Sequence, residues 1–178
     1  MKTIYSAYDL QEALKKEFFA GFFVSGRKWY LEKYPLGLFM GEVCEDTYMN
    51  VQFFPAIPKI PGCLLKEIIT YFQQNLNKEY VVQVVYRKGR FSVNYPDMQQ
   101  SSKYMVSYAF QIPIGTLLVM TIHSHNTMPA YFSATDDEDE KITGLYGVIG
   151  RLDQKPQIRC RASLCGSFCD IAVKELFY

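Results

Sequence analysis

The sequence lacks the features of several common functional classes. It has only 2 histidines in 178 residues, no run of basic residues and a formal net charge of +1. Without a positive field over the chain or over one segment, we expect no nucleic-acid partner and no binding to a membrane surface. The sequence also has no glycine-rich phosphate loop, which argues against a nucleotide-binding enzyme of that type.

Long hydrophobic runs are missing as well. The longest apolar segments, such as "IGTLLVMTI", are too short to cross a bilayer, and the N-terminal "MKTIYSAYDLQEALKK" is polar where a signal peptide needs an apolar core. The 5 cysteines are an odd number without framework spacing, which fits a reducing compartment better than a disulfide scaffold. We therefore expect a cytoplasmic protein.

The first third of the chain is predicted to be a small β-rich element, residues 1–56. A short amphipathic helix is expected at "AYDLQEALKKEFF" (residues 7–19), followed by strands in "GFFVSGRKWYLEKY" and "LGLFMGEV". Pro55, Pro58 and Pro61 then predict an extended connector, because each proline disfavours helix in the residue before it. We place a domain boundary in this connector.

The remainder, residues 57–178, is predicted to be an α/β domain. The apolar residues of "CLLKEIITYFQQNL" recur at helical spacing and predict a helix of about three turns. Strands are expected in "EYVVQVVYRKGRFSVNYP" (two, joined at "KG"), "KYMVSYAFQI", "GTLLVMTIHSH", "ITGLYGVIGRL" and "QIRCRASLCG", and "FCDIAVKELF" is expected to hold a final element. The expected architecture is a mixed β-sheet sandwiched by helices.

Both histidines lie in one short segment, "HSHNTMPAYFSATDDEDE". His123 and His125 alternate with Ser124 at the end of a predicted strand, so their side chains should point to the same face. Two imidazoles from one strand end can bind one metal ion, and a catalytic zinc site adds a third ligand, often a carboxylate, and an open position for water. The acidic run 136–140 supplies candidates for that ligand, and composition alone does not choose among them.

The spacing of these residues resembles the signature of the JAMM (JAB/MPN) metalloprotease family. His123 and His125 are followed after seven residues by Ser133, and Asp136 stands three positions later. The resemblance implies a JAB/MPN-like (cytidine-deaminase-like) fold from about residue 61 to the end of the sequence. It also implies one zinc ion per chain, held by His123, His125 and Asp136.

The same resemblance implies two residues that take part in catalysis. A glutamate on an earlier strand serves as general base, and Glu79 in "NKEYVVQVVY" fits that place, whereas Glu67 is the weaker candidate because it lies within the predicted helix. Zinc would polarise a bound water, and Glu79 would accept its proton and return it to the departing amine. Ser133 is implied to donate a hydrogen bond to the oxyanion of the tetrahedral intermediate.

A narrower resemblance joins the chain to the bacterial JAB-domain proteins of PRTRC systems. It rests on "HSHNTMPAYFSATDDEDE", "YGVIGRLDQKPQIRCRASLCG" and "VNYPDMQQSS". Those proteins are encoded beside small ubiquitin-like and E1-like or ThiF-like partners, which implies hydrolysis of an amide at the C-terminus of a ubiquitin-like modifier. The chain departs from the eukaryotic enzymes at Asn126 and Phe132, which replace prolines, and at Val82, which replaces a glycine.

Other interpretations stay open at this point. The chain could be a non-catalytic scaffold or binding module on the same fold, or a zinc hydrolase that acts on a small amide. Ser133 and Asp136 also have the spacing of a capping box, and the acids 137–140 are expected in the first turn of a helix, where they would complement its dipole. Cys160, Cys165 and Cys169 lack a close Cys-x-x-Cys pair, and we expect buried free thiols.

Overall fold

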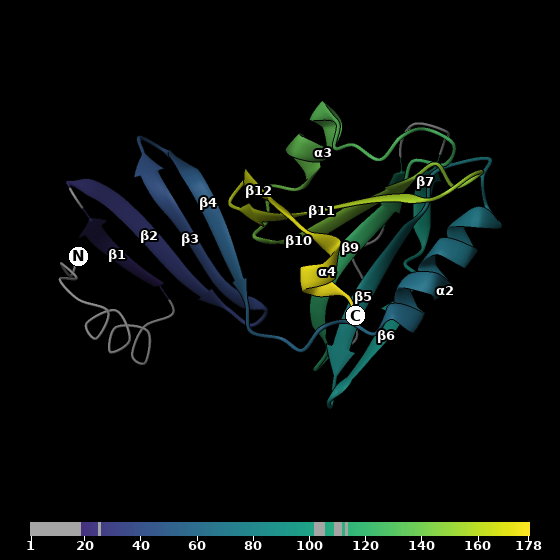
Figure 1. The fold of residues 1–178 in the computed structure, drawn as a ribbon, viewed down its shortest axis with the longest axis horizontal. Coiled ribbons are helices and arrows are strands. Elements are labelled where there is room, and N and C mark those ends of the chain that lie inside the picture. The colour runs from purple at the N-terminus through teal and green to yellow at the C-terminus, as the bar shows by residue number, and fades with distance from the viewer. Residues whose placement is uncertain (1–18, 25, 102–105, 109–111, 113) are drawn as a thin grey trace.

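The structure is a computed structural model that describes residues 19–24, 26–101, 106–108, 112 and 114–178. It contains a four-stranded sheet of order β1-β2-β3-β4, a six-stranded sheet of order β12-β11-β10-β9-β5-β6, and a two-stranded sheet of β7 and β8 (Figure 1). The chain thus has the mixed α/β architecture that the sequence predicts.

The four-stranded sheet is an antiparallel meander that precedes the connector. Its strands are β1 (Phe19–Val24), β2 (Arg27–Tyr34), β3 (Gly37–Cys44) and β4 (Thr47–Pro55). The helix expected at residues 7–19 falls outside the described residues, except that Phe19 begins β1. The sequence reasoning missed β4, because this strand buries few side chains and so lacks a continuous apolar pattern. The boundary at residue 56 stays a prediction.

The six-stranded sheet places the histidines at the end of β9, one of its two central strands: His123 lies in β9, and His125 follows its last residue. β9 and β10 run parallel, and the other neighbouring pairs of this sheet are antiparallel. Its strands are β5 (Val81–Arg87), β6 (Arg90–Asn94), β9 (Leu117–Ser124), β10 (Gly144–Gly150), β11 (Gln157–Leu164) and β12 (Ser167–Ile171), while β7 (Met98–Ser101) and β8 (Val106–Tyr108) form the separate pair. The predicted turn between β5 and β6 is confirmed, since Lys88 and Gly89 both have positive φ.

The principal helix, α2 (Gly62–Gln73), confirms the helix predicted from the apolar spacing. It begins after Pro61 and buries Ile68 and Phe72. The Ile60 N–H ahead of it donates to the Leu176 carbonyl at 2.7 Å, so α2 begins beside the last helix. Two shorter helices among the described residues are α3 (Ala134–Asp139) and α4 (Val173–Leu176). No helix among the described residues is both long enough and apolar enough to span a bilayer.

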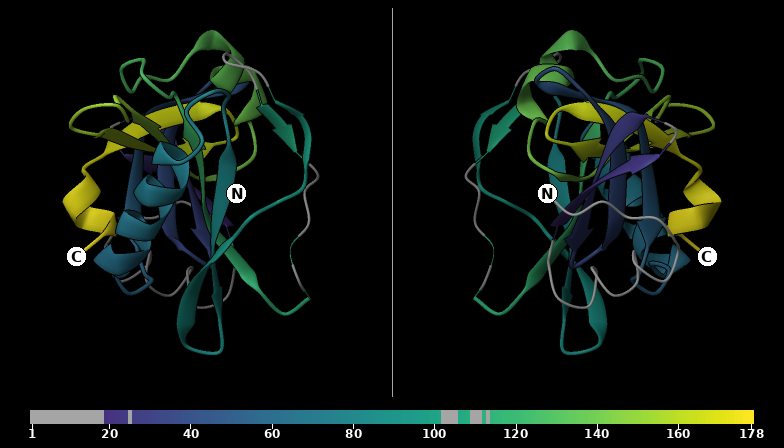
Figure 2. Two further views of the ribbon diagram at one scale, coloured as in Figure 1. Left: turned by 90° about the vertical axis from the view of Figure 1, so that its right-hand side faces the viewer. Right: turned by 90° about the vertical axis from the view of Figure 1, so that its left-hand side faces the viewer.

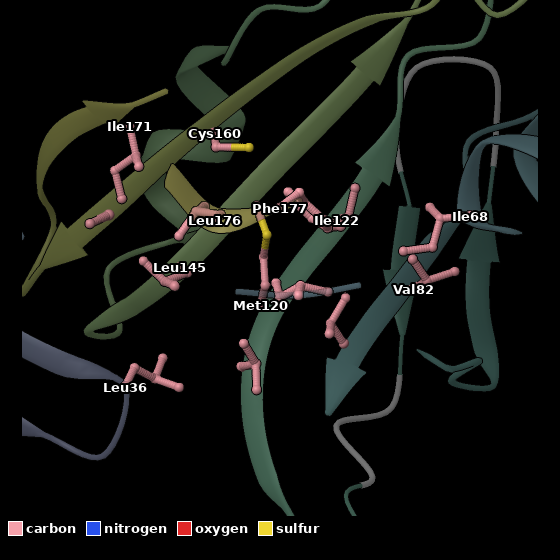
Figure 3. Packing of buried hydrophobic residues seen from close by; sticks show 14 of the residues in the cluster. Leu36, Ile68, Val82, Met120, Ile122, Leu145, Cys160, Ile171, Leu176 and Phe177 are labelled. Carbon is pink, nitrogen blue, oxygen red and sulfur yellow. The ribbon is translucent and has the colours of Figure 1, made fainter. Parts of the chain in front are cut away.

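A single hydrophobic core joins the two large sheets. Leu36, in the turn from β2 to β3, and Phe39 of β3 belong to the same buried cluster as Leu145 and Leu164 of the six-stranded sheet. Figure 3 shows Leu36 next to the side of the cluster that Leu145 occupies. β3 and β4 pack on β11 and β12. The right-hand view of Figure 2 shows the N-terminal sheet on the side that faces the viewer, in front of the rest of the molecule. The N-terminal strands therefore lie within reach of the site described next.

The five cysteines, all of which the structure describes, are free thiols. Cys160 is buried and Cys169 is half-buried, as expected for structural thiols. Cys165 is exposed, so the expectation of a buried thiol is wrong at this position. Cys165 follows Leu164 at the turn between β11 and β12, where the backbone has positive φ and the chain leaves the core.

Candidate metal centre

The two histidines converge at the end of β9. The Nε2 atoms of His123 and His125 lie 3.2 Å apart. The His125 N–H donates to the Ile149 carbonyl at 2.8 Å, which continues the pairing of β9 with β10 by one residue. Both side chains therefore stay on one face of the sheet, and both residues are buried.

Asp136 completes the group from the first turn of α3. Its Oδ1 lies 3.3 Å from the His123 Nε2, and the three potential ligand atoms all lie within 4.8 Å of one another. Ligands bound at about 2.0–2.1 Å in a tetrahedral zinc site are separated from each other by about 3.3 Å. The His123–His125 and His123–Asp136 separations match this spacing, so the three side chains fit one zinc ion and leave its fourth position for water.

The protonation states of the histidines also suit metal binding. Burial lowers the pKa of His123, and burial likewise lowers the pKa of His125. The Asp136 carboxylate opposes both shifts. The imidazoles are thus neutral at pH 7, which is the form that binds a metal.

Hydrogen bonds to atoms that do not face the proposed metal position orient the candidate ligands His125 and Asp136. The His125 Nδ1 lies 3.3 Å from the Pro129 carbonyl, a contact that places the proton on Nδ1 and leaves the lone pair on Nε2. The Asp136 Oδ2 accepts from the Ser133 N–H at 2.6 Å and from the Ser133 hydroxyl at 2.7 Å. Oδ1 is therefore the carboxylate oxygen that faces the histidines.

Ser133 is the N-cap of α3, and the predicted capping box is present. The Asp136 N–H donates to the Ser133 hydroxyl at 3.2 Å, and the Asp136 side chain accepts from the Ser133 backbone. The hydroxyl proton of Ser133 points to Asp136 in this arrangement, so its evident role is to hold the ligand carboxylate. Donation to an oxyanion stays a prediction, and it requires the hydroxyl to turn away from Asp136.

Glu79 lies beside the histidines, just before β5. Tyr80 fixes this segment, because its N–H donates to the Ser124 hydroxyl at 2.9 Å and its carbonyl accepts from the Ser124 N–H at 2.9 Å. Glu79 is only 4% exposed. Burial, and to a lesser extent the charge of Asp136, raise the pKa of Glu79 to about 7. The weaker candidate, Glu67, is exposed on α2 and accepts a hydrogen bond from Tyr95.

A cavity of about 290 Å³ connects these groups. Glu79, His123, His125, Ser133 and Asp136 all line it. The apolar part of its lining includes the β9 residues Leu117, Leu118 and Val119. It also includes Tyr34 at the end of β2 and Leu36 in the turn from β2 to β3. The structure thus brings every predicted site residue to one cavity, and the N-terminal sheet supplies part of the wall.

Residues 66–163, more than half of the chain, match the model of a protein family described as prokaryotic homologs of the JAB domain. The chain belongs to this family. Among solved structures, a protein from Desulfitobacterium hafniense is similar at a TM-score of 0.47 and 14% identity, over 63% of this chain and 90% of that one. A JAB1/MPN domain protein from Archaeoglobus fulgidus is similar at a TM-score of 0.44 and 17% identity, over 65% of this chain and 95% of that one. No curated protein sequence gives a significant match.

One departure of this JAB domain from the eukaryotic pattern has a direct structural reason. Asn126, which follows the second histidine, has φ 49°. Proline holds φ near −65° and cannot adopt this conformation. Asparagine tolerates it better than most residues, so the loop after His125 takes a path that the family's proline does not allow.

A second departure, Phe132, has a packing partner that sequence reasoning missed. Its ring centroid lies 4.0 Å from the guanidinium carbon of Arg161, a buried residue of β11. Arg161 also binds Glu140 and Asp137. A buried strand that contains an arginine was the available signal, because a buried guanidinium requires an anionic partner.

The interpretation of the acidic run as helix-start electrostatics is wrong for its last three members. Only Asp136 and Asp137 lie in the first turn of α3, while Glu140 is the C-cap and is buried. An acid at the C-terminal end of a helix is unfavourable, so Glu140 needs its contact with Arg161. Burial raises the pKa of Glu140, and the Arg161 guanidinium opposes that rise.

Proposed function

We propose that this JAB domain is a zinc-dependent isopeptidase or peptidase that hydrolyses an amide bond at the C-terminus of a ubiquitin-like modifier. The observation that carries the proposal is the convergence of two imidazole Nε2 atoms and a carboxylate oxygen at zinc spacing, in one cavity with Glu79. A zinc hydrolase that works at neutral pH needs such a ligand set and a base with a pKa near the working pH.

The chain's own groups have separate roles in this reaction. His123, His125 and Asp136 would hold the zinc ion. When bound, zinc lowers the pKa of a water molecule to about 7 and polarises the substrate carbonyl. Glu79 accepts the proton of the attacking water and delivers it to the leaving amine, and its raised pKa suits both transfers. Ser133 keeps Asp136 oriented and is the proposed hydrogen-bond donor to the oxyanion.

The proposed substrate follows from the resemblance to the JAB-domain proteins of PRTRC systems. A ubiquitin-like modifier or its conjugates would supply the scissile amide, and an E1-like or ThiF-like protein is a further proposed partner. The apolar part of the cavity, with Tyr34 and Leu36 in its wall, supports a substrate that extends beyond the amide group itself. A small amide would leave this part of the cavity unfilled.

A cleavage assay tests the proposal. The zinc-loaded chain is incubated with a ubiquitin-like protein extended by a few residues beyond its C-terminal glycine. We expect release of the extension, loss of the reaction in Glu79→Gln, and retention in Glu67→Gln, the matched control on the exposed side of α2. If Glu79→Gln still cleaves, the general base is misassigned. If zinc binds and neither modifier precursors nor conjugates are cleaved, the chain is a non-catalytic binding module.

A further inference from the structure

Arg161 connects β11 to helix α3, which carries the metal-ligating carboxylate. Its guanidinium carbon lies 4.0 Å from the ring centroid of Phe132 and 3.7 Å from that of Phe168. Its Nε donates to Glu140 at 2.7 Å, and its Nη1 donates to Asp137 at 2.6 Å. The cation thus contacts two aromatic rings and donates hydrogen bonds to two carboxylates.

These contacts span the whole of α3. Phe132 precedes the N-cap, Asp137 lies in the first turn and Glu140 is the C-cap, so one guanidinium contacts the helix at both ends. Asp136 lies between the contact points. Figure 1 shows α3 above β11 and β12, the strands that supply Arg161 and Phe168.

The helix has little else to hold it in place. α3 has only six residues, and none of them is buried. A helix of this length is not stable alone, and a run of five consecutive acids adds repulsion between like charges. Among the described residues, the other lysine or arginine that pairs with an acid of α3 is Lys141. Its contact with Glu138 is solvent-exposed and contributes little to stability. The capping box fixes Asp136 relative to Ser133, but it does not attach α3 to the sheet.

We propose that Arg161 is a positioning residue for the metal centre: it clamps α3 to β11 and thereby holds Asp136 at the point where His123 and His125 converge. Among the described residues, the polar partners of the guanidinium are Glu140 and Asp137 and not the three candidate ligands, although its charge contributes to lowering the pKa of His123. The guanidinium acts through the helix, in the way that outer partners of metal ligands set metal affinity. This inference rests on the proposed zinc site and adds to it a residue outside the family signature.

Zinc titration of the metal-free full-length chain against a competing chelator tests the proposal. The variant is Arg161→Met combined with Glu140→Gln, so that no buried carboxylate is left without its cation. We expect zinc to bind roughly 10- to 100-fold more weakly than to the wild type, the loss typical of an outer partner. Arg161→Lys should lose zinc affinity by a smaller factor, because an ammonium keeps the positive charge but lacks the planar guanidinium that binds both carboxylates.

Arg159→Met is the matched control. Arg159 lies two residues away on β11 and pairs with Asp170 at 3.2 Å on the exposed surface. The zinc affinity of the Arg159→Met variant should stay within about twofold of the wild type, since an exposed ion pair contributes little to stability. Asp137→Asn is a milder variant, because the Asp137 side chain is half-exposed. It should weaken zinc binding measurably.

The readouts separate a positioning role from a merely structural one. Urea unfolding of the metal-free proteins reports stability, and the titration reports the affinity of chains that are still folded. If folded Arg161 variants and Asp137→Asn bind zinc as tightly as the wild type, the proposal is overturned. If the wild-type chain itself binds no zinc, the proposed metal site fails, and this inference fails with it.

Discussion

Glu79→Gln should stabilise the metal-free protein at neutral and alkaline pH while it abolishes catalysis. Glu79 is buried, and its pKa is raised from 4.5 to about 7. Below pH 4.5 the carboxyl is protonated in both the folded and unfolded chains, so its burial has no charge-related cost. Between pH 4.5 and about 7 the unfolded chain ionises first, which stabilises the unfolded state. Glutamine removes this cost.

The magnitude follows from the size of the pKa change. A rise from 4.5 to about 7 corresponds to at most about 3 kcal/mol. Glu79 lines an open cavity, and solvent screening reduces this to about 1–2 kcal/mol. Urea unfolding of the metal-free variant should therefore give a higher midpoint than the wild type at pH 8 and the same midpoint at pH 4.

Glu67→Gln is the control for this comparison, because Glu67 is exposed on α2 and lies outside the cavity. The same midpoint for wild type and Glu79→Gln at pH 8 would refute the reasoning. An equal gain at pH 4 and pH 8 would refute it too, since that result would place the effect in packing rather than in the buried charge.

Four further outcomes follow from the structure. The catalytic efficiency kcat/KM should rise with pH until Glu79 is ionised. The rise should end at about pH 7, or at a lower pH because a bound cation would lower the pKa of Glu79; a pH profile that falls over this range contradicts the base assignment. Ser133→Ala should lose about 1 kcal/mol of stability in urea unfolding through its cap and bind zinc more weakly, whereas unchanged zinc affinity would deny its hold on Asp136. Asn126→Pro should destabilise the fold by about 3 kcal/mol in the same measurement, with Asn126→Gly as the tolerated control. Gly150→Ala should also destabilise it, because the added Cβ would lie 2.3 Å from a carbonyl oxygen of the loop after His125, and a wild-type midpoint would contradict that clash.

The elements that the sequence predicted well have strong periodic patterns. Helix α2 follows from its apolar spacing, and β9 follows from an apolar run that ends in the two histidines. The metal-ligand spacing was also readable, because a strand period of two fixes His123 and His125 to one face and a capping box fixes Ser133 to Asp136. These are local relations, which a sequence expresses directly.

The parts that could not be predicted depend on contacts between distant segments. Arg161 and Glu140 are 21 positions apart, and neither residue forms a recognisable motif. The reach of Tyr34 and Leu36 into the cavity depends on how the N-terminal sheet packs on β11 and β12, which no local pattern reports. Whether each acid in the run 136–140 lies at the start or at the end of α3 depends on where this helix ends. Helix ends are the feature that is hardest to predict from a sequence.

Zinc stoichiometry is the most direct test of the central claim. The full-length chain is purified without chelator, and its metal content is measured by elemental analysis beside a variant with His123→Ala and His125→Ala. The geometry of the three ligands predicts about one zinc per wild-type chain and essentially none in the variant. A wild-type content below about a tenth of an equivalent, or equal content in both proteins, would contradict the zinc-hydrolase account.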